Sequence, residues 1–183
     1  MLMTADTYDW NQEMIVRSVG FVQSELKNPS LAADREGLTS SGKGEDRRRE
    51  ARDIKNMVSR IVVNPALSGI LDGLAGFSHA LILYWPHLAK PESRKLIRVH
   101  PMGRKDFDQV GVFASCSPGR PNPILATAVK VMGVSGNVLT VQGLEAVDQS
   151  PVLDIKPYTR HYLEVQGLKL ADWMERIERE LEE

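Results

Sequence analysis

The sequence predicts a single mainly β domain, a barrel-like sheet with short helices and an amphipathic helix near the carboxy terminus. Short apolar runs recur along the chain between turns rich in Gly and Pro, which is typical of β barrels. The 183 residues suffice for one domain with a real core, and 42% of them are apolar. No internal repeat and no second domain are visible.

The first strand is predicted at residues 14–22, after a polar and loose stretch at 1–13. Residues 14–158 are expected to form the β core. Within it, residues 27–56 form an insertion, because loop formers come first and a run of charges follows at 45–55. We predict a solvated loop there, either partly helical or flexible.

The later elements follow from local patterns of apolar residues. Residues 80–85 form a continuous apolar run, which predicts a strand buried on both faces. Residues 168–182 predict an amphipathic helix, and its apolar face contains Trp173 and Met174. The remaining predicted elements are a strand at 58–63, a short helix at 66–74, strands at 96–99, 111–114 and 152–155, and a hairpin of 124–132 with 138–142.

Composition excludes several classes of protein. Net charge is −1, from 23 basic and 24 acidic residues, so the whole chain has no general attraction for nucleic acid. One cysteine excludes an internal disulfide framework and a cysteine-based zinc site, and four scattered histidines predict no metal. No apolar run approaches a membrane span, and the acidic amino-terminal residues do not resemble a signal peptide. We therefore expect a cytoplasmic protein.

The stretch at 111–123, GVFASCSPGRPNP, carries the most chemical information. Its glycine and prolines prevent regular structure and stiffen the backbone after a short strand. A stiff segment can hold polar groups ready for a ligand. From composition alone an ordinary loop between strands is the alternative. The polar side chains and the thiol that this segment presents are Ser115, Cys116, Ser117, Arg120 and Asn122.

Three blocks in this order resemble the TsaA-like family, also called TrmO. They are LAGFSHALILY at 74–84, the stretch at 111–123, and LEAVDQSPVLDIKPY at 144–158. The resemblance implies a barrel-like β fold and an S-adenosylmethionine-dependent methyltransferase acting on tRNA. This sequence departs from the family pattern in three places. Cys116 replaces an Arg, Leu125 with Ala126 replaces a Gly-Leu pair, and Gln149 replaces a Gly.

The resemblance also implies site residues. No glycine-rich GxGxxG turn is present, so loops would have to hold the cofactor. The implied cofactor residues are His87, Leu88, Cys116, Ala126, Thr127, Leu144, Glu145, Ala146, Val147 and Asp148. The implied substrate residues are Ser117, Arg120, Asn122 and Lys156. A structural alternative is that Arg120 pairs with an acid such as Asp154 and braces two loops.

Basic residues suggest two surfaces for the phosphates of tRNA. One is the stretch at 90–105, where Arg98 and Arg104 are the candidates, with a charged surface turn as the alternative. The other is the insertion, as an arm using Arg47, Arg48, Arg49 and Arg52.

The implied reaction methylates N6 of threonylcarbamoyladenosine at position 37, beside the anticodon. A general base would help, because that nitrogen is urea-like. The candidates are Asp148, Asp154 and Tyr158, with His79 also possible. The family also implies a homodimer, for which exposed Trp173 and Met174 would supply a contact. The alternatives are an S-adenosylmethionine-binding protein with another methyl acceptor, and a β-barrel binding module without catalysis.

Overall fold

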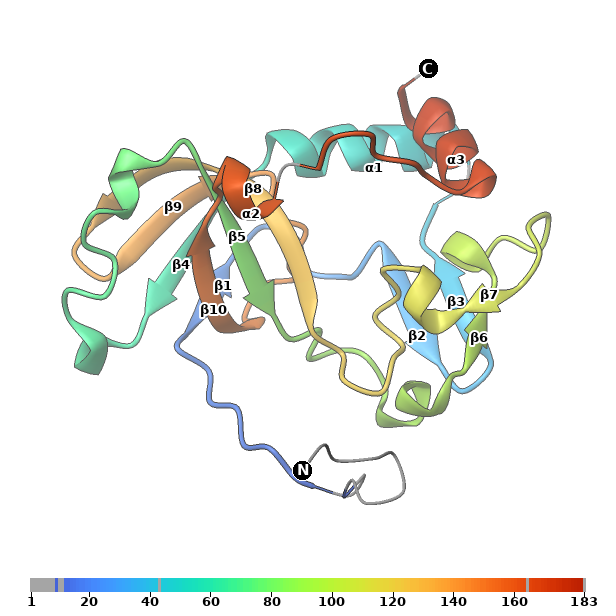
Figure 1. The fold of residues 1–183 in the computed structure, drawn as a ribbon, viewed down its shortest axis with the longest axis horizontal. Helices are drawn as coiled ribbons and strands as arrows, with labels where there is room; N and C mark the ends of the chain where they lie inside the picture. The colour runs from blue at the N-terminus through green and yellow to red at the C-terminus, as the bar shows by residue number, and fades with distance from the viewer. Residues whose placement is uncertain (1–8, 10–11, 43, 164, 183) are drawn as a thin grey trace, which may run out of the picture.

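A closed barrel of antiparallel strands forms one side of the molecule in the computed structural model (Figure 1). The structure describes residues 9, 12–42, 44–163 and 165–182. Around the barrel the order is β1, β10, β5, β8, β9 and β4, and β4 pairs with β1 to close it. The bounds are β1 Gly20–Gln23, β4 Val58–Val63, β5 His79–Tyr84, β8 Leu125–Ser135, β9 Val138–Gln142 and β10 Pro151–Pro157. The predicted mainly β barrel is confirmed.

Alternate residues of each strand point into the barrel, as the two-residue period of a strand requires. On β5, Ala80, Ile82 and Tyr84 are buried in the core. Leu81 and Leu83, on the other face, are only half-buried. The prediction that this strand is buried on both faces was therefore wrong, because a continuous apolar run does not show which side other elements will cover.

Three excursions of the chain, after β1, after β5 and after β10, build a second layer on the open side of the barrel (Figure 1). After β1 the chain forms a hairpin and then α1, which runs from that layer back to β4. After β5 it forms short helical turns and a two-stranded ladder. After β10 it crosses to the carboxy-terminal helix, which contacts α1. The elements are β2 Leu31–Asp34, β3 Gly37–Ser40, α1 Glu45–Asn56, η4 Pro91–Lys95, β6 Arg98–Val99, η5 Pro101–Gly103, β7 Val110–Gly111, η6 Val112–Ala114, α2 Arg160–Leu163 and α3 Asp172–Glu182.

Several predicted boundaries needed correction. The first strand begins at Gly20 rather than at residue 14, and Met14, Ile15 and Val16 are strongly exposed because β4 and β10 pair only with residues from Gly20 onward. Most of 1–13 lies outside the described residues. The helix predicted at 66–74 is replaced by two short 3₁₀ turns, η2 Pro65–Leu67 and η3 Leu74–Gly76. The strand predicted at 111–114 ends at Gly111 and continues as η6.

The insertion at 27–56 is more ordered than predicted. It contains a β-hairpin, which the sequence did not suggest, and a helix where the charge run lies. Three of the four α1 arginines, Arg47, Arg48 and Arg52, are engaged within the molecule, whereas Arg49 is exposed. Arg48 lies 2.7 Å and Arg52 3.4 Å from Glu45 carboxylate oxygens, and Arg47 donates to the Gly42 carbonyl oxygen. These contacts favour a structural helix over a free arm.

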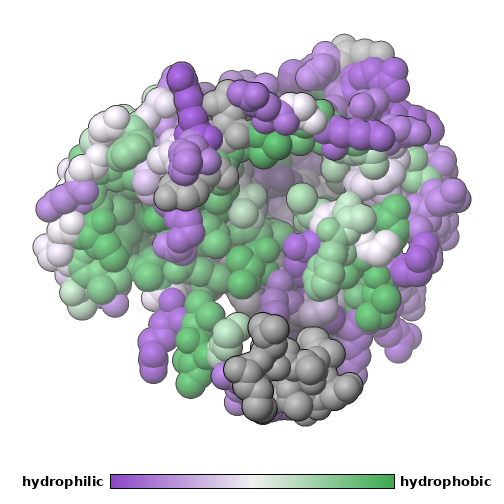
Figure 2. All heavy atoms as spheres, viewed as in Figure 1, coloured by the Kyte–Doolittle hydropathy of each residue, from purple (hydrophilic) through white to green (hydrophobic). Residues whose placement is uncertain are grey.

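Hydrophilic residues gather over the α3 end of the molecule in Figure 2, whereas apolar residues gather over the barrel. The composition of α3, DWMERIERELE, accounts for this, because most of its residues are charged. None of the helices in the described part of the chain is long and apolar enough to cross a membrane.

Gln149 occupies a backbone conformation that favours glycine, with φ of 65°. This is the position at which the family pattern has Gly. A left-handed residue with a side chain costs about 1–2 kcal/mol, and part of this is offset because Gly loses more entropy on folding. We expect Gln149→Gly to raise the free energy of unfolding by about 0.5–1 kcal/mol in urea titrations. Gln142→Gly, within β9, is the control and should lower the free energy of unfolding. A lower free energy of unfolding in both variants would contradict backbone strain at Gln149.

Candidate functional site

A cavity of about 370 Å³ lies between the open end of the barrel and the second layer. Its size is within the range of small-molecule sites. Residues from the barrel end and from all three excursions contribute to its lining. From the barrel end come Tyr84, Leu125, Ala126, Thr127, Glu145, Val147 and Ser150; from the excursions come, among others, Ser30, Leu38, His87, Leu88, Met102, Cys116, Ser117, Arg120, Trp173, Met174 and Ile177.

The loop at residues 111–123, which we call the signature loop, forms one wall of this cavity, and Arg120 holds it in shape. The Arg120 Nε atom donates to the Ser117 carbonyl oxygen at 2.9 Å. Its Nη2 atom donates to the Val112 carbonyl oxygen at 3.2 Å and to that of Ser115. A guanidinium can bind several carbonyls at once because its donors point in fixed directions. Arg120 therefore braces the loop through backbone oxygens, and the alternative in which it pairs with Asp154 is not found.

Polar groups converge on the barrel side of the cavity. The Tyr84 hydroxyl donates to the Glu145 carbonyl oxygen at 2.7 Å, which fixes the start of the loop between β9 and β10. The Glu145 carboxylate accepts a hydrogen bond from the Ser30 hydroxyl of the first excursion. Ser150 is buried, and its hydroxyl lies 3.3 Å from His87 Nδ1. The barrel side thus combines one carboxylate, one imidazole and several hydroxyl groups.

Burial raises the pKa of Tyr84 to about 12, and this makes a testable prediction. The hydroxyl stays neutral and donates at physiological pH, so Tyr84→Phe should lower the free energy of unfolding by about 1 kcal/mol. Since the pKa is raised on folding, this stability is fully present below the unfolded value of about 10 and is lost as pH rises towards 12. Urea titrations of both proteins at several pH values should show the difference between them shrinking above pH 10. A difference that grows there would contradict this assignment.

The carboxy-terminal helix covers the cavity. Trp173 and Met174 are half-buried and Ile177 is buried, and all three line the cavity. The prediction that Trp173 and Met174 are exposed for a dimer contact was wrong, because the apolar face of α3 turns towards the barrel. The homodimer itself stays a prediction.

An ionic cluster attaches α3 to the second excursion. Arg104 pairs with Asp106 at 2.6 Å and with Glu180, and Arg176 pairs with the same two carboxylates at 3.1 and 3.0 Å. Both guanidinium groups also lie over the Phe107 ring, at 4.4 and 4.9 Å from its centroid. The Arg104 guanidinium holds the pKa of Asp106 at about 2, well below its usual range. Arg104 is thus engaged in holding α3 to the rest of the molecule.

Comparison with known proteins identifies the family. Residues 43–163 match the family described as tRNA-methyltransferase O N-terminal domain. The chain belongs to this family. The three sequence blocks at 74–84, 111–123 and 144–158 all lie in the matched region. The family assignment predicted from these blocks is confirmed.

Individual relatives agree with the family assignment. A probable S-adenosyl-L-methionine-binding protein of Methanothermobacter thermautotrophicus is 38% identical over 81% of this chain and 92% of its own length. A human tRNA (adenine(37)-N6)-methyltransferase is 40% identical over 62% of this chain but only 25% of its own length. The crystal structure of TrmO from Pseudomonas aeruginosa shares the fold, with a TM-score of 0.62 at 24% identity over 86% of this chain and 61% of that one.

The structure brings together most of the cofactor residues implied by the family. His87, Leu88, Cys116, Ala126, Thr127, Glu145 and Val147 line the cavity, as do the implied substrate residues Ser117 and Arg120. Cys116, which replaces the family Arg, is exposed there. Leu144 and Ala146 are fully buried in the core and support the lining from behind.

Asp148 does not line the cavity. Its carboxylate accepts a hydrogen bond from the Ser24 amide at 3.0 Å and pairs with Lys27 at 2.8 Å. The lysine holds the pKa of Asp148 below its usual value, with a further contribution from the Ser24 amide. Asp148 therefore joins the end of β1 to the loop before β10.

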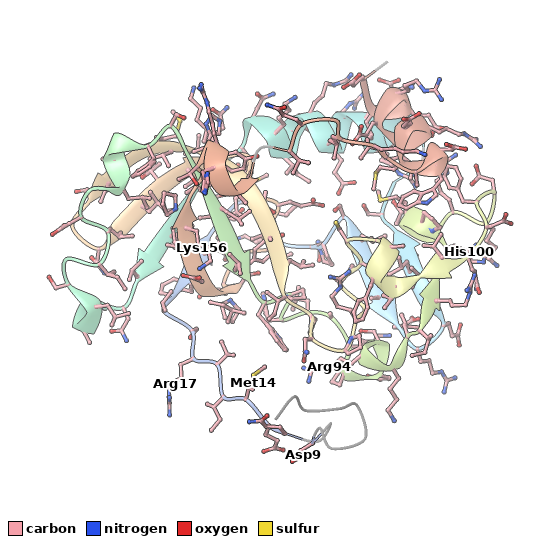
Figure 3. All side chains as sticks on the ribbon, in the orientation of Figure 1. Asp9, Met14, Arg17, Arg94, His100 and Lys156 are labelled. Carbon is pink, nitrogen blue, oxygen red and sulfur yellow. The ribbon has the colours of Figure 1, made fainter. Side chains whose placement is uncertain are left out.

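The other predicted residues also lie outside the cavity lining. Asp154 pairs with Lys156 at 2.5 Å on β10, and Figure 3 shows Lys156 on the barrel, across the molecule from His100. Tyr158 is partly exposed beyond the end of β10, and Arg98 donates to the Gln109 carbonyl oxygen. Asn122 is exposed.

Sequence reasoning missed four groups of the lining: Tyr84, Ser30, Ser150 and the apolar face of α3. Tyr84 ends a predicted strand, but nothing local indicates that its hydroxyl caps a distant carbonyl. The face of α3 was visible as a periodic pattern, yet the pattern does not say what it packs against. Across the described ranges, no three His, Cys, Asp or Glu side chains gather as a metal site would require.

Proposed function

We propose that this chain binds S-adenosylmethionine in the cavity and transfers its methyl group to tRNA, at N6 of threonylcarbamoyladenosine 37. One observation carries the proposal: residues of all three sequence blocks, at 74–84, 111–123 and 144–158, line one cavity. These blocks are far apart in the sequence, and a role in folding alone would not require them to border the same cavity. Relatives named as S-adenosyl-L-methionine-binding proteins and as a tRNA methyltransferase support it.

The lining suits this cofactor chemically. Apolar side chains match the adenine ring, and Ser, Thr and Glu groups match the ribose hydroxyls, the amino group and the positive charge. When bound, the cofactor supplies an electrophilic methyl carbon and a neutral leaving group. The residues that would hold it are His87, Leu88, Cys116, Ala126, Thr127, Glu145 and Val147, with Leu144 and Ala146 behind them.

The chain must also position the acceptor nitrogen and receive its proton. Of the lining residues, Glu145 and His87 carry the carboxylate and imidazole groups that commonly serve as general bases. Both come from the barrel side, where hydrogen bonds to Ser30 and Ser150 hold them in place. Their position favours them over Asp148, Asp154 and Tyr158, whose side chains are engaged elsewhere. We propose that Arg120 acts as a positioning residue through the loop it braces.

The tRNA would approach along the second excursion, which borders the cavity on both sides of residues 90–100. Lys95 and Arg94 remain without an acidic partner among the described residues, and Arg94 lies over the Trp85 ring at 5.1 Å. A cation beside an aromatic ring suits both phosphate and stacked bases. Arg104, in contrast, is neutralised by Asp106 and Glu180.

A second candidate function is methyl transfer to another acceptor, or cofactor binding alone. It is favoured by the near-neutral net charge and by the internal pairing of Arg48, Arg52 and Arg104. The names of the archaeal relatives likewise give a cofactor and no acceptor.

Two measurements test the proposal in order. Calorimetry with S-adenosylmethionine should show one site per chain, and no binding would exclude both candidate functions. Mass analysis of nucleosides from tRNA of a deletion strain, with and without the complementing gene, should show the N6-methylated nucleoside only with the gene. Binding without this difference would leave the second candidate.

A further inference from the structure

The cavity is polarised, and its apolar side is built largely from parts of the chain outside the matched family domain. The carboxylate of Glu145, the imidazole of His87 and the hydroxyls of Thr127 and Ser150 come from the barrel end and its adjoining loops. Opposite them lie apolar side chains that we call the α3 wall: Leu38, Pro101, Met102, Trp173, Met174 and Ile177. Trp173, Met174 and Ile177 follow residue 163, where the family match ends, and Leu38 precedes residue 43, where it begins.

The members of the α3 wall are held together by close contacts. The η5 turn packs on β3, and a Cβ atom added at Gly103 would lie only 2.4 Å from the Leu38 carbonyl oxygen. The ionic cluster around Phe107 joins this same turn to α3 through Arg104 and Glu180. The wall is therefore one packed unit made of η5, β3 and α3.

We propose that the α3 wall holds the adenine base of the bound cofactor, with Trp173 and Met174 in contact with the ring. This rests on the function proposed above. S-adenosylmethionine is itself polarised, because its base is flat and uncharged whereas its other parts carry hydroxyl and charged groups. Placing the base on the α3 wall puts the charged groups beside Glu145, Thr127 and Ser150. The reverse orientation would bury charge against six apolar side chains, which is costly.

Trp173 has the chemistry for this contact. Among the described residues, the lining contains one tyrosine and one tryptophan. The hydroxyl of the tyrosine, Tyr84, is already bonded to the Glu145 carbonyl oxygen. Aromatic rings bind bases by stacking, and the thioether of Met174 packs well against a flat ring. The half-burial of Trp173 leaves part of its ring available.

Calorimetry with S-adenosylmethionine and with S-adenosylhomocysteine tests the wall, because both ligands contain the same base and only the first has a sulfonium charge. We expect Trp173→Ala to weaken both ligands by a similar factor, roughly tenfold or more. Trp173→Phe keeps a ring and should retain most of the affinity. Glu178→Ala, exposed on the outer face of α3, is the matched control and should bind like the parent.

Two outcomes would overturn the proposal. Trp173→Ala could leave both affinities unchanged, or it could weaken S-adenosylmethionine alone, which would place the charged sulfur and not the base at Trp173. If the parent protein binds neither ligand, the proposed function fails instead, so the two failures are distinct.

A fluorescence measurement keeps the test independent of folding defects. The chain has three tryptophans, so Trp10→Phe with Trp85→Phe leaves Trp173 as the only one. Its emission should change in intensity and wavelength as either ligand saturates the site. No change, in a protein that binds the ligand by calorimetry, would contradict contact with the base.

Discussion

Gly20→Ala is expected to lower the free energy of unfolding by about 3 kcal/mol or more, the largest effect of any single methyl group that we foresee in this barrel. A Cβ atom at Gly20 would lie 2.3 Å from the Val62 carbonyl oxygen and 2.9 Å from the Val63 Cα atom. These are backbone atoms of β4, so they can move only if the pairing that closes the barrel is lost. Urea unfolding followed by circular dichroism measures the effect.

Gly133→Ala is the matched control for this prediction. Gly133 also lies in a barrel strand, but a Cβ atom there would have no heavy atom within 4 Å. Its substitution should change the free energy of unfolding by no more than about 1 kcal/mol. Equal urea midpoints for the two variants would show that the approach of β1 to β4 is not tight.

Arg120→Met should weaken S-adenosylmethionine binding by about tenfold or more, because losing a single hydrogen bond to a charged group costs about 1.5–3 kcal/mol. The side chain supports three carbonyl oxygens of the signature loop, and Ser115, Cys116 and Ser117 of that loop line the cavity. Without the guanidinium these carbonyls lose their shared partner and the loop loses its fixed shape. Arg120→Lys should rescue little, since an ammonium group cannot reach several carbonyls in fixed directions.

Calorimetry and urea titration together separate this effect from general instability. Arg60→Met removes the same charge from an exposed position on β4 and should bind the cofactor like the parent. If Arg120→Met binds normally while its stability falls, the brace serves the fold alone.

The sequence predicted those parts of the fold that depend on local patterns. The strand at 58–63 and the hairpin of β8 and β9 appear close to where alternation and turn residues predict them. It could not predict the start of β1, because Met14, Ile15 and Val16 have the composition of a strand but no partner beside them. Pairing depends on neighbours that are distant in the chain, and a local pattern contains no information about them.

The candidate site was partly predictable for a similar reason. The resemblance supplied His87, Cys116, Thr127 and Glu145, which line the cavity. It also implied Asp148, which instead joins the end of β1 to the loop before β10. A position in the family block does not distinguish such a structural role from a role in binding. The part that could not be predicted, the α3 wall, depends on how a helix after the family domain folds back.

The pairing of β1 with β10 also determines when this protein can fold during its synthesis. Gly20 is among the first residues of the barrel to be made, yet it pairs with Val152 of β10, the last barrel strand to be made. Until residues 151–157 have left the ribosome, β1 and β5 each keep an unpaired edge, and open strand edges attract other chains. The barrel can therefore close only after β10 has emerged. We expect chaperones that bind strand edges to protect the nascent chain until β10 pairs with β1 and β5.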